Sequence, residues 1–213
     1  ITVCGTVFSM VCTIMAAYPL SRKSMYARRF CTLAIVFTML FGAGIIPTFL
    51  VMKALGLINS YGAIWMAGLI SAYNMLVMKT FFEGLPEEME EAARIDGCGE
   101  WRLLLQIILP LSKPVLAALT LFYGVSYWNQ FMNVLIFINE TSKYNLTVLV
   151  QNMLRSQMLM QELNNINPEE VHSLTPETIK AAGVVVMIAP MLIVYPLLQK
   201  YFLKGVMIGA IKG

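Results

Sequence analysis

The sequence has little charge. Charged residues make up only 13% of the chain, which contains a single histidine, His172. The five long uncharged runs named below contain no Asp, Glu, Lys, Arg or His. Ion-coupled carriers usually place such groups near mid-membrane as relays or ion ligands, so this absence argues against a proton- or sodium-driven carrier. No GxxxxGK[ST] motif occurs either, so the chain is not its own P-loop ATPase.

The sequence also offers little for redox or metal chemistry. Its four cysteines, which form no CxxC pair and have no histidine at ligand spacing, are Cys4, Cys12, Cys31 and Cys98. Three of them lie in apolar runs, where cysteine behaves as a small hydrophobe, and disulfide and metal sites are both poorly supported. A membrane-embedded enzyme would need a nucleophile–base pair or a metal cluster. We therefore expect no catalytic residue, no metal and no cofactor held by this chain.

Long apolar runs dominate instead, since hydrophobic residues make up 58% of the chain and the mean hydropathy is +0.71. The uncharged runs are Ile1–Ser21, Phe30–Met52, Ala54–Met78, Pro114–Asn139 and Ala181–Gln199. A helix needs about 20 residues to cross the roughly 30 Å hydrocarbon layer. The sequence therefore predicts an all-α, polytopic membrane helical bundle with five spans, the second kinked near Pro47.

The basic residues predict the orientation of these spans. Placing the 22–29 loop, the 79–113 region and the C-terminal tail on one side collects eleven of the fifteen Lys and Arg. The other side receives Lys53, Lys143, Arg155 and Lys180. By the positive-inside rule the first side is cytoplasmic, so the 139–180 segment is external. Within that segment, Asn145–Leu163 has helix-like apolar spacing.

The most highly charged stretch, Glu87–Pro110, predicts a helix–turn–helix. Pro86 suits the start of the first helix, and the glutamates after it suit its N-terminal dipole. Glu90 and Arg94 are one turn apart, in the better orientation for an ion pair.

Two glycines, Gly97 and Gly99, provide a stop and a sharp turn. Trp101–Leu109 reads as a second, more apolar helix that ends near Pro110. An ordinary amphipathic connector is the simpler interpretation of the stretch.

One spacing in this stretch resembles the EAA loop of ABC importer permeases. The seven matching positions are Glu91, Ala92, Ala93, Gly97, Ile107, Leu109 and Pro110. They match without a gap, which makes the motif specific. The resemblance implies that residues 83–111 form a cytoplasmic coupling helix–turn–helix that docks into a groove on an ATP-binding subunit. The ATPase-coupling residues it implies are Glu91, Ala92, Ala93, Arg94, Asp96, Gly97, Ile107, Leu109 and Pro110.

Neutral polar and aromatic residues cluster in the third and fourth runs. The candidates for a substrate pathway are Tyr73, Asn74, Tyr123, Tyr127, Trp128, Asn129, Gln130 and Asn133. Aromatic faces with amide and hydroxyl groups suit an uncharged polyhydroxyl ligand. The alternative is that these residues form an interfacial belt and hydrogen-bond neighbouring helices. The 128–131 stretch, WNQF, is similar to one common in sugar permeases of the maltose-importer type, and the 201–213 tail resembles that of carbohydrate permeases.

The resemblance covers nearly all of the chain. It implies that residues 1–213 are a single transmembrane permease domain of the bacterial plasma membrane. Because relatives usually have six spans and Ile1 is not an initiator Met, we expect a fragment lacking one N-terminal span. The implied function is the non-catalytic permease subunit of an ATP-driven oligosaccharide importer, closest to the aldouronate branch. An importer of a non-sugar solute or a secondary transporter is the alternative.

The family also implies the partners of this chain. They are a second related permease, two cytoplasmic ATP-binding subunits, an extracellular solute-binding protein that meets the 139–180 loop, and membrane lipids. The ATPase pair would bind the ATP. No nucleic-acid partner is expected, since the placement of the basic residues explains the net charge of +3.

Overall fold

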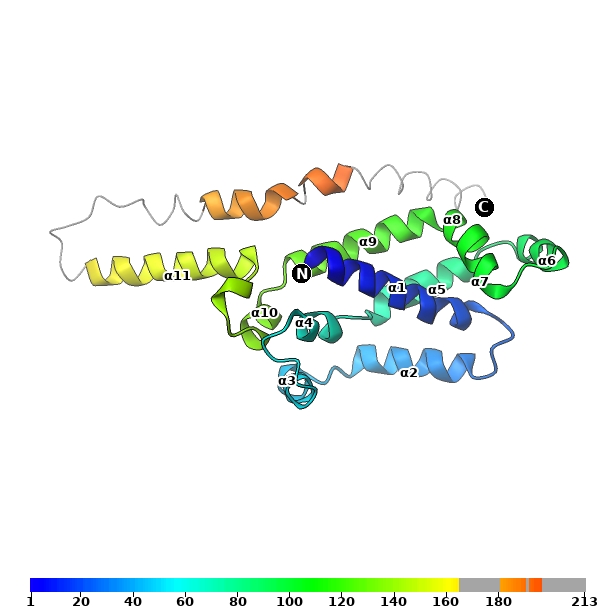
Figure 1. Ribbon diagram of the computed structural model, residues 1–213, viewed down its shortest axis with the longest axis horizontal. Coiled ribbons are helices and arrows are strands. Elements are labelled where there is room, and N and C mark those ends of the chain that lie inside the picture. Colours follow the sequence, from blue (N-terminus) through cyan, green and yellow to red (C-terminus); the bar gives the residue numbers. More distant parts are fainter. Residues whose placement is uncertain (165–180, 191, 197–213) are drawn as a thin grey trace.

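The computed structural model describes residues 1–164, 181–190 and 192–196 of the chain (Figure 1). All regular structure in these residues is helical, which confirms the predicted all-α class. The helices are α1 (Thr2–Ser21), α2 (Arg28–Leu40), α3 (Ile45–Ala54), α4 (Tyr61–Ala67), α5 (Ala72–Glu83), α6 (Glu87–Ile95), α7 (Glu100–Leu103), η1 (Leu104–Ile108), α8 (Leu109–Leu111), α9 (Lys113–Trp128), α10 (Met132–Phe137), η2 (Thr141–Lys143) and α11 (Leu146–Asn164). Residues 181–190 and 192–196 are also helical. The predictions for His172, Lys180 and the 201–213 tail lie outside the described residues.

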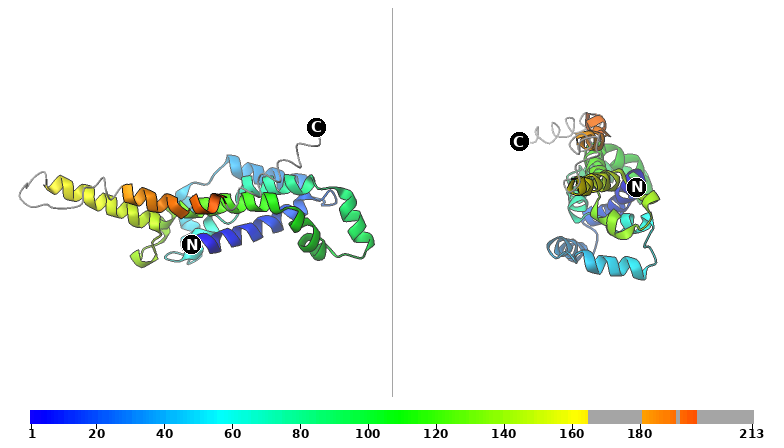
Figure 2. Two further views of the ribbon diagram at one scale, coloured as in Figure 1. Left: turned by 90° about the horizontal axis from the view of Figure 1, so that it is seen from above. Right: turned by 90° about the vertical axis from the view of Figure 1, so that its left-hand side faces the viewer.

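The molecule is elongated, with α6 at one end of its long axis and α11 at the other (Figures 1 and 2). Between them lies a bundle in which α1 packs most extensively against α5 and α9. The helix predicted over Asn145–Leu163 is confirmed by α11. Two predicted functional regions therefore lie at opposite ends of one bundle.

A stripe of small residues explains why α1 lies at the centre. Gly5, Ser9, Thr13 and Ala17 recur every four residues, so they share one face of the helix, and all four are buried. In a bilayer, small residues favour helix association because they let two backbones approach closely. The stripe therefore defines the packing face of α1.

Two tyrosines of α9 extend into this stripe. The hydroxyl oxygens of Tyr127 and Ser9 are 2.9 Å apart, and those of Tyr123 and Thr13 are 2.7 Å apart. Both pairs are buried hydrogen bonds. Since the residue number rises along α1 as it falls along α9, the two helices are antiparallel. The same two bonds fix their register.

Of the helices that the structure describes, α1 alone is long and apolar enough to cross a membrane. Up to four spans result if each of three bent helix pairs counts as one. The bends are 115° between α2 and α3, 55° between α4 and α5, and 82° between the 100–111 helical segment and α9. The predicted second and third spans are therefore each bent, whereas the 82° bend lies just before the predicted fourth span.

The break in the second run lies several residues before the predicted kink. The helix ends at Leu40, and the next begins after Gly44, whose φ of +79° only glycine adopts readily. Pro47 falls in the first turn of α3, where its missing N–H leaves no intrahelical bond unmade. The glycines, and not the proline, redirect the chain.

The third and fourth runs break at polar groups. Ser71 caps α5, since its Oγ accepts a hydrogen bond from the Asn74 N–H at 3.4 Å. In the fourth run, α9 ends at Trp128 and α10 begins at Met132. Trp128 also contacts the last described helix, because its indole N–H donates to the Met187 carbonyl at 2.9 Å. A hydropathy window detects the length of an apolar run but not its breaks.

Replacing Gly5 tests the close approach of α1. A Cβ built there would lie 2.9 Å from two ring carbons of Tyr127 and 3.0 Å from Trp65 Cδ1. We expect Gly5→Val to lower the free energy of unfolding by about 1–3 kcal/mol, because the rings must move. The matched control is Gly42→Val, where a Cβ meets nothing within 4 Å. Unfolding in detergent measures both, and equal midpoints for the two variants would contradict the packing described.

Candidate functional site

The first helix of the predicted coupling segment ends in a glycine cap. The Gly97 N–H donates to the Arg94 carbonyl at 3.0 Å, and the Cys98 N–H donates to the Ala93 carbonyl at 2.9 Å. This pair of bonds is the Schellman motif, which needs a left-handed residue, and Gly97 has φ +75°. The predicted stop at Gly97 is confirmed. Gly99 is extended, with φ −71°, and precedes α7.

The second arm contains a wide turn. Helical structure runs from Glu100 to Leu111, which confirms the helix predicted over Trp101–Leu109 and its end near Pro110. Over Leu104–Ile108 it is a π-helix, in which the Leu109 N–H donates to the Leu104 carbonyl. Pro110 has no N–H, and its ring would clash with the carbonyl four residues earlier in a regular α-helix. The wide turn gives this proline room, and such turns occur frequently at functional sites.

The α6 helix turns two faces in different directions. Ala93 is only 7% exposed and belongs to the hydrophobic core, with Ile107 and Leu109 packed against the same core. Ile95 is 86% exposed, and Ala92 is exposed as well. The other predicted coupling residues that are exposed are Glu91, Arg94, Asp96, Gly97 and Pro110. The small size of Ala93 therefore brings α6 close to its own bundle, whereas Ala92 faces outward.

The predicted ion pair between Glu90 and Arg94 is wrong, because each side chain has another partner. Glu90 forms an ion pair with Arg22, whose guanidinium lies 4.3 Å above the Tyr18 ring. Arg94 Nη2 lies 2.6 Å from Glu100 Oε1, and the Tyr18 hydroxyl donates to Glu100 Oε2 at 2.6 Å. These contacts anchor both arms of the segment to the end of α1. Spacing within one helix could not reveal partners from another.

A second ionic cluster joins α2 to α5 at the same end. Glu83 forms ion pairs with Arg28 and with Lys79, whose Nζ is 2.8 Å from Glu83 Oε1. Together with the Arg22–Glu90 pair, this cluster brings the 22–29 loop and the 79–113 region together, as the distribution of basic residues predicted. Which side of the membrane this end faces stays a prediction.

A polar cluster around Asn59 ties two loops together near the α11 end. The Asn59 N–H donates to the Phe137 carbonyl at 2.7 Å, and its Oδ1 accepts from the N–H groups of Asn139 and Glu140, both at 3.2 Å. Its carbonyl accepts from Lys143 Nζ at 3.1 Å. The Asn59 amide donates to the Glu140 carboxylate, and this bond, with Lys143 beside it, lowers the pKa of Glu140. The cluster fixes how the α11 segment leaves the bundle.

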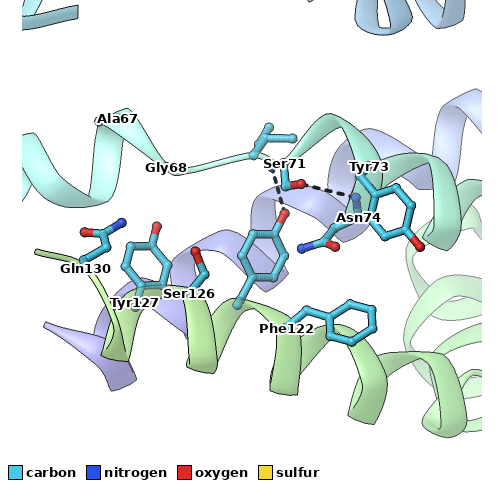
Figure 3. A pocket seen from close by; sticks show the side chains of 11 residues that line it. Ala67, Gly68, Ser71, Tyr73, Asn74, Phe122, Ser126, Tyr127 and Gln130 are labelled. Atoms are coloured by element: carbon cyan, nitrogen blue, oxygen red, sulfur yellow. Dashed lines mark hydrogen bonds between the residues drawn. The ribbon is translucent and has the colours of Figure 1, made fainter. Parts of the chain in front are cut away.

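A cavity of about 550 Å³ opens where α4 and α5 break, facing α9 (Figure 3). It is lined by five of the eight predicted pathway residues, which are Tyr73, Asn74, Tyr123, Tyr127 and Gln130. Ser71 lies beside them. The remaining three do not line it: Trp128 packs on the last helix, Asn129 is exposed past the end of α9, and Asn133 is in α10. The structure therefore brings together most of the predicted pathway residues, but not the Trp-Asn pair.

Some of the lining residues bond neighbouring helices, and others are available to a substrate, so both roles that the sequence left open are present. The hydroxyls of Tyr123 and Tyr127 are engaged by α1, and the Tyr123 oxygen also accepts from the Ser71 N–H at 3.0 Å. These two tyrosines act as interhelical bonds. Gln130 Oε1, by contrast, is buried without a hydrogen-bond partner in the described part of the chain. Together with the exposed Tyr73 ring, it gives the cavity uncommitted polar and aromatic groups.

Sequence reasoning missed two lining residues of α9, Phe122 and Ser126. They fall with Tyr123, Tyr127 and Gln130 at the three- and four-residue spacing of one helix face. That spacing could have identified both residues from the sequence. They were overlooked because one is apolar and the other is a small polar residue, so residue type did not group them with the tyrosines.

This architecture is that of a membrane permease subunit. Residues 9–208 match the family described as the inner membrane component of binding-protein-dependent transport systems, and the chain belongs to that family. Its relatives include two proteins of Bacillus subtilis (strain 168). It is 41% identical to the polygalacturonan/rhamnogalacturonan transport system permease protein YtcP, over 100% of this chain and 74% of that protein. It is also 41% identical to protein LplC, over 100% of this chain and 72% of that protein.

A solved structure supports the same fold. A chain in the crystal structure of a bacterial ABC transporter involved in the import of the acidic polysaccharide alginate matches with a TM-score of 0.79 at 34% identity. The match covers 94% of this chain and 71% of that one. The overall fold is therefore one that a solved transporter also has.

Removing the Tyr123 hydroxyl tests the assignment of the cavity wall. We expect Tyr123→Phe to lower the free energy of unfolding by about 1 kcal/mol, since the Thr13 hydroxyl and the Ser71 N–H lose their partner. Tyr73→Phe removes the same atom from an exposed ring that makes no hydrogen bond within the described chain, and should leave stability unchanged. Unfolding midpoints measured side by side check the difference, and a larger loss for Tyr73→Phe would refute it.

Proposed function

We propose that this chain is the membrane-spanning permease subunit of an ATP-driven importer of oligosaccharides, with ATP bound by separate subunits. The observation that carries the proposal is α6, a capped helix that projects from the end of the bundle and forms an ion pair with Arg22 at the end of α1. Family membership supports the transport role. Several relatives support the cargo class, since their names specify polygalacturonan/rhamnogalacturonan and arabinooligosaccharides.

In the proposed mechanism, the outer face of α6 docks on an ATP-binding subunit. Glu91, Ala92 and Ile95 would make the contact, and the Schellman cap at Gly97 would hold the turn in one shape. Because Glu90 and Glu100 are bound by Arg22 and Tyr18 at the end of α1, movement of α6 would be passed to α1. The hydrogen bonds from α1 to α9 would then carry it to the cavity wall. Through these contacts, movement of α6 on the ATP-binding subunit would change the shape of the cavity, as alternating access requires.

The cavity suits the neutral part of a saccharide. Tyr73 offers an aromatic face, and Asn74 and Gln130 offer amide groups, a combination that recognises hydroxyls without a buried charge. No charged side chain is among its lining residues. A uronate carboxylate would thus find no cation in this wall. We infer that this chain contacts the rings and hydroxyl groups of the sugar, and that any preference for acidic cargo comes from a partner subunit.

The proposed assembly places the α6 end in the cytoplasm of a bacterium and the α11 end outside. Two ATP-binding subunits would meet the first end, and a solute-binding protein would meet the second. A related permease would complete the pathway, with the whole chain acting as a multi-pass protein of the plasma membrane. The distribution of lysine and arginine between the two ends supports this orientation.

Reconstitution tests the function directly. The chain would be co-purified with its partners from native membranes, placed in proteoliposomes, and assayed for ATP hydrolysis with and without a solute-binding protein loaded with oligosaccharide. We expect hydrolysis and sugar uptake to rise together. A preparation that retains no ATP-binding subunit, or that transports sugar on an ion gradient alone, would overturn the proposal.

A pair of glycine variants tests the role of the cap. A Cβ added at either Gly97 or Gly99 would meet nothing within 4 Å, so only backbone conformation distinguishes the two positions. We expect Gly97→Val to uncouple hydrolysis from uptake, because a β-branched residue at φ +75° is strained by about 1–2 kcal/mol or more. Gly99→Val should couple normally. The ratio of sugar transported to ATP hydrolysed is the measurement, and equal ratios for the two variants would remove the cap from the mechanism.

A further inference from the structure

A strongly basic pocket lies where α2 meets α5, at the end of the bundle that carries α6. Its volume is about 490 Å³, and its cationic lining residues are Lys23, Arg28, Arg29 and Lys79. No acidic residue is among the lining residues. The neighbouring cavity on the α6 side differs, since three glutamates line it: Glu83, Glu90 and Glu91. Of these two neighbouring cavities, the pocket at α2 therefore presents cations without carboxylates.

Arg28, Lys79 and Arg29 carry more positive charge than the one carboxylate that the structure pairs with them. Glu83 is shared between Arg28 and Lys79, so one carboxylate serves two cations. Lys79 is only 8% exposed, so sharing its one carboxylate with Arg28 leaves a buried cation that is only partly compensated. Arg29 forms no ion pair with any carboxylate in the described part of the chain. An anion in the pocket would remove this excess.

The pocket continues into an apolar surface along α2, since Leu33 is one of its lining residues. Arg29, Leu33 and Phe37 are spaced four residues apart, so they lie on one face of α2. Leu33 is 60% and Phe37 is 59% exposed, and no residue of α2 is buried. Figure 2 shows α2 and α3 at the margin of the bundle. A ligand with an anionic head and an apolar tail would contact both parts at once.

We propose that this pocket binds the phosphate headgroup of an anionic phospholipid, with the acyl chains along the Leu33 and Phe37 face of α2. Basic pockets between membrane helices bind such headgroups because each lysine or arginine attracts the phosphate at the membrane surface. The contacts of Arg28 and Lys79 with Glu83 place the lipid beside the loop that leads into α6. The bound headgroup would then stabilise the junction between the bundle and α6. The proposal depends on the charge and the exposure of α2, and not on the identity of the cargo.

The test compares lipids and charge variants in one binding assay. The full chain would be titrated in phosphatidylcholine nanodiscs with phosphatidylglycerol that carries brominated acyl chains. The quenching of Leu33→Trp in excess of that of the unaltered chain, which has three tryptophans of its own, would report binding. We expect saturable quenching by brominated phosphatidylglycerol, and much weaker quenching by brominated phosphatidylcholine. Arg29→Gln should weaken phosphatidylglycerol binding roughly fivefold, the loss expected for one cation at a membrane surface.

Arg155→Gln is the matched control. It removes the same charge from an exposed site on α11, at the opposite end of the molecule, and should leave binding unchanged. Equal weakening by both variants would show attraction to net charge alone and would overturn the site. Equal quenching by both lipids would overturn it as well. So would displacement by inorganic phosphate at millimolar concentration, since that result would assign the pocket to a free anion.

Discussion

The structure depends on the buried contact between α1 and α9. Within a bilayer the lipid chains are as apolar as the side chains, so helices are not driven together by the hydrophobic effect. They associate through close packing and hydrogen bonds, and α1 supplies both through one stripe. Gly5 and Ala17 let the partner helices approach, while Ser9 and Thr13 bind the hydroxyls of Tyr127 and Tyr123. The other helices are arranged around this antiparallel pair.

This contact also connects the two ends of the molecule. At one end, Tyr18 and Arg22 bind the glutamates that hold α6 and α7. At the start of the same helix, the Trp65 indole N–H donates to the Ile1 carbonyl at 3.1 Å and ties α4 to α1. The cavity lies between these anchors, with its α9 wall bonded to α1. A single straight helix thus touches the α6 segment, the cavity wall and the opposite end of the bundle.

The sequence alone predicted the helical class and several of the helices, but not where the apolar runs break and bend. The helical class, the stop at Gly97 and the helix at α11 followed from local signals: apolar length, glycine placement and apolar spacing. The bends did not, because a charge-free run such as Phe30–Met52 has the same hydropathy whether or not Gly44 turns the chain by 115°. The partners of Glu90 and Arg94 were missed because they come from distant segments.

The predicted pathway residues also show that residue type does not reveal which side chains are bonded to another helix. Tyr123 and Tyr127 were placed at the cavity by residue type, yet their hydroxyls are committed to Ser9 and Thr13. The four-residue period of small residues in the first run would have revealed the helix-packing face, but not which tyrosines it meets. Only the fold shows that Gln130, a lining residue of the cavity, retains an oxygen without a partner among the described residues.

Crosslinking from the outer face of α6 would show whether this helix couples the chain to an ATPase. A photoreactive amino acid would replace Ile95, the most exposed large apolar residue of α6, and native membranes would be irradiated before solubilisation. We expect a covalent adduct with an ATP-binding subunit. An adduct only with a second copy of this chain, with no ATP-binding subunit retained, would contradict it.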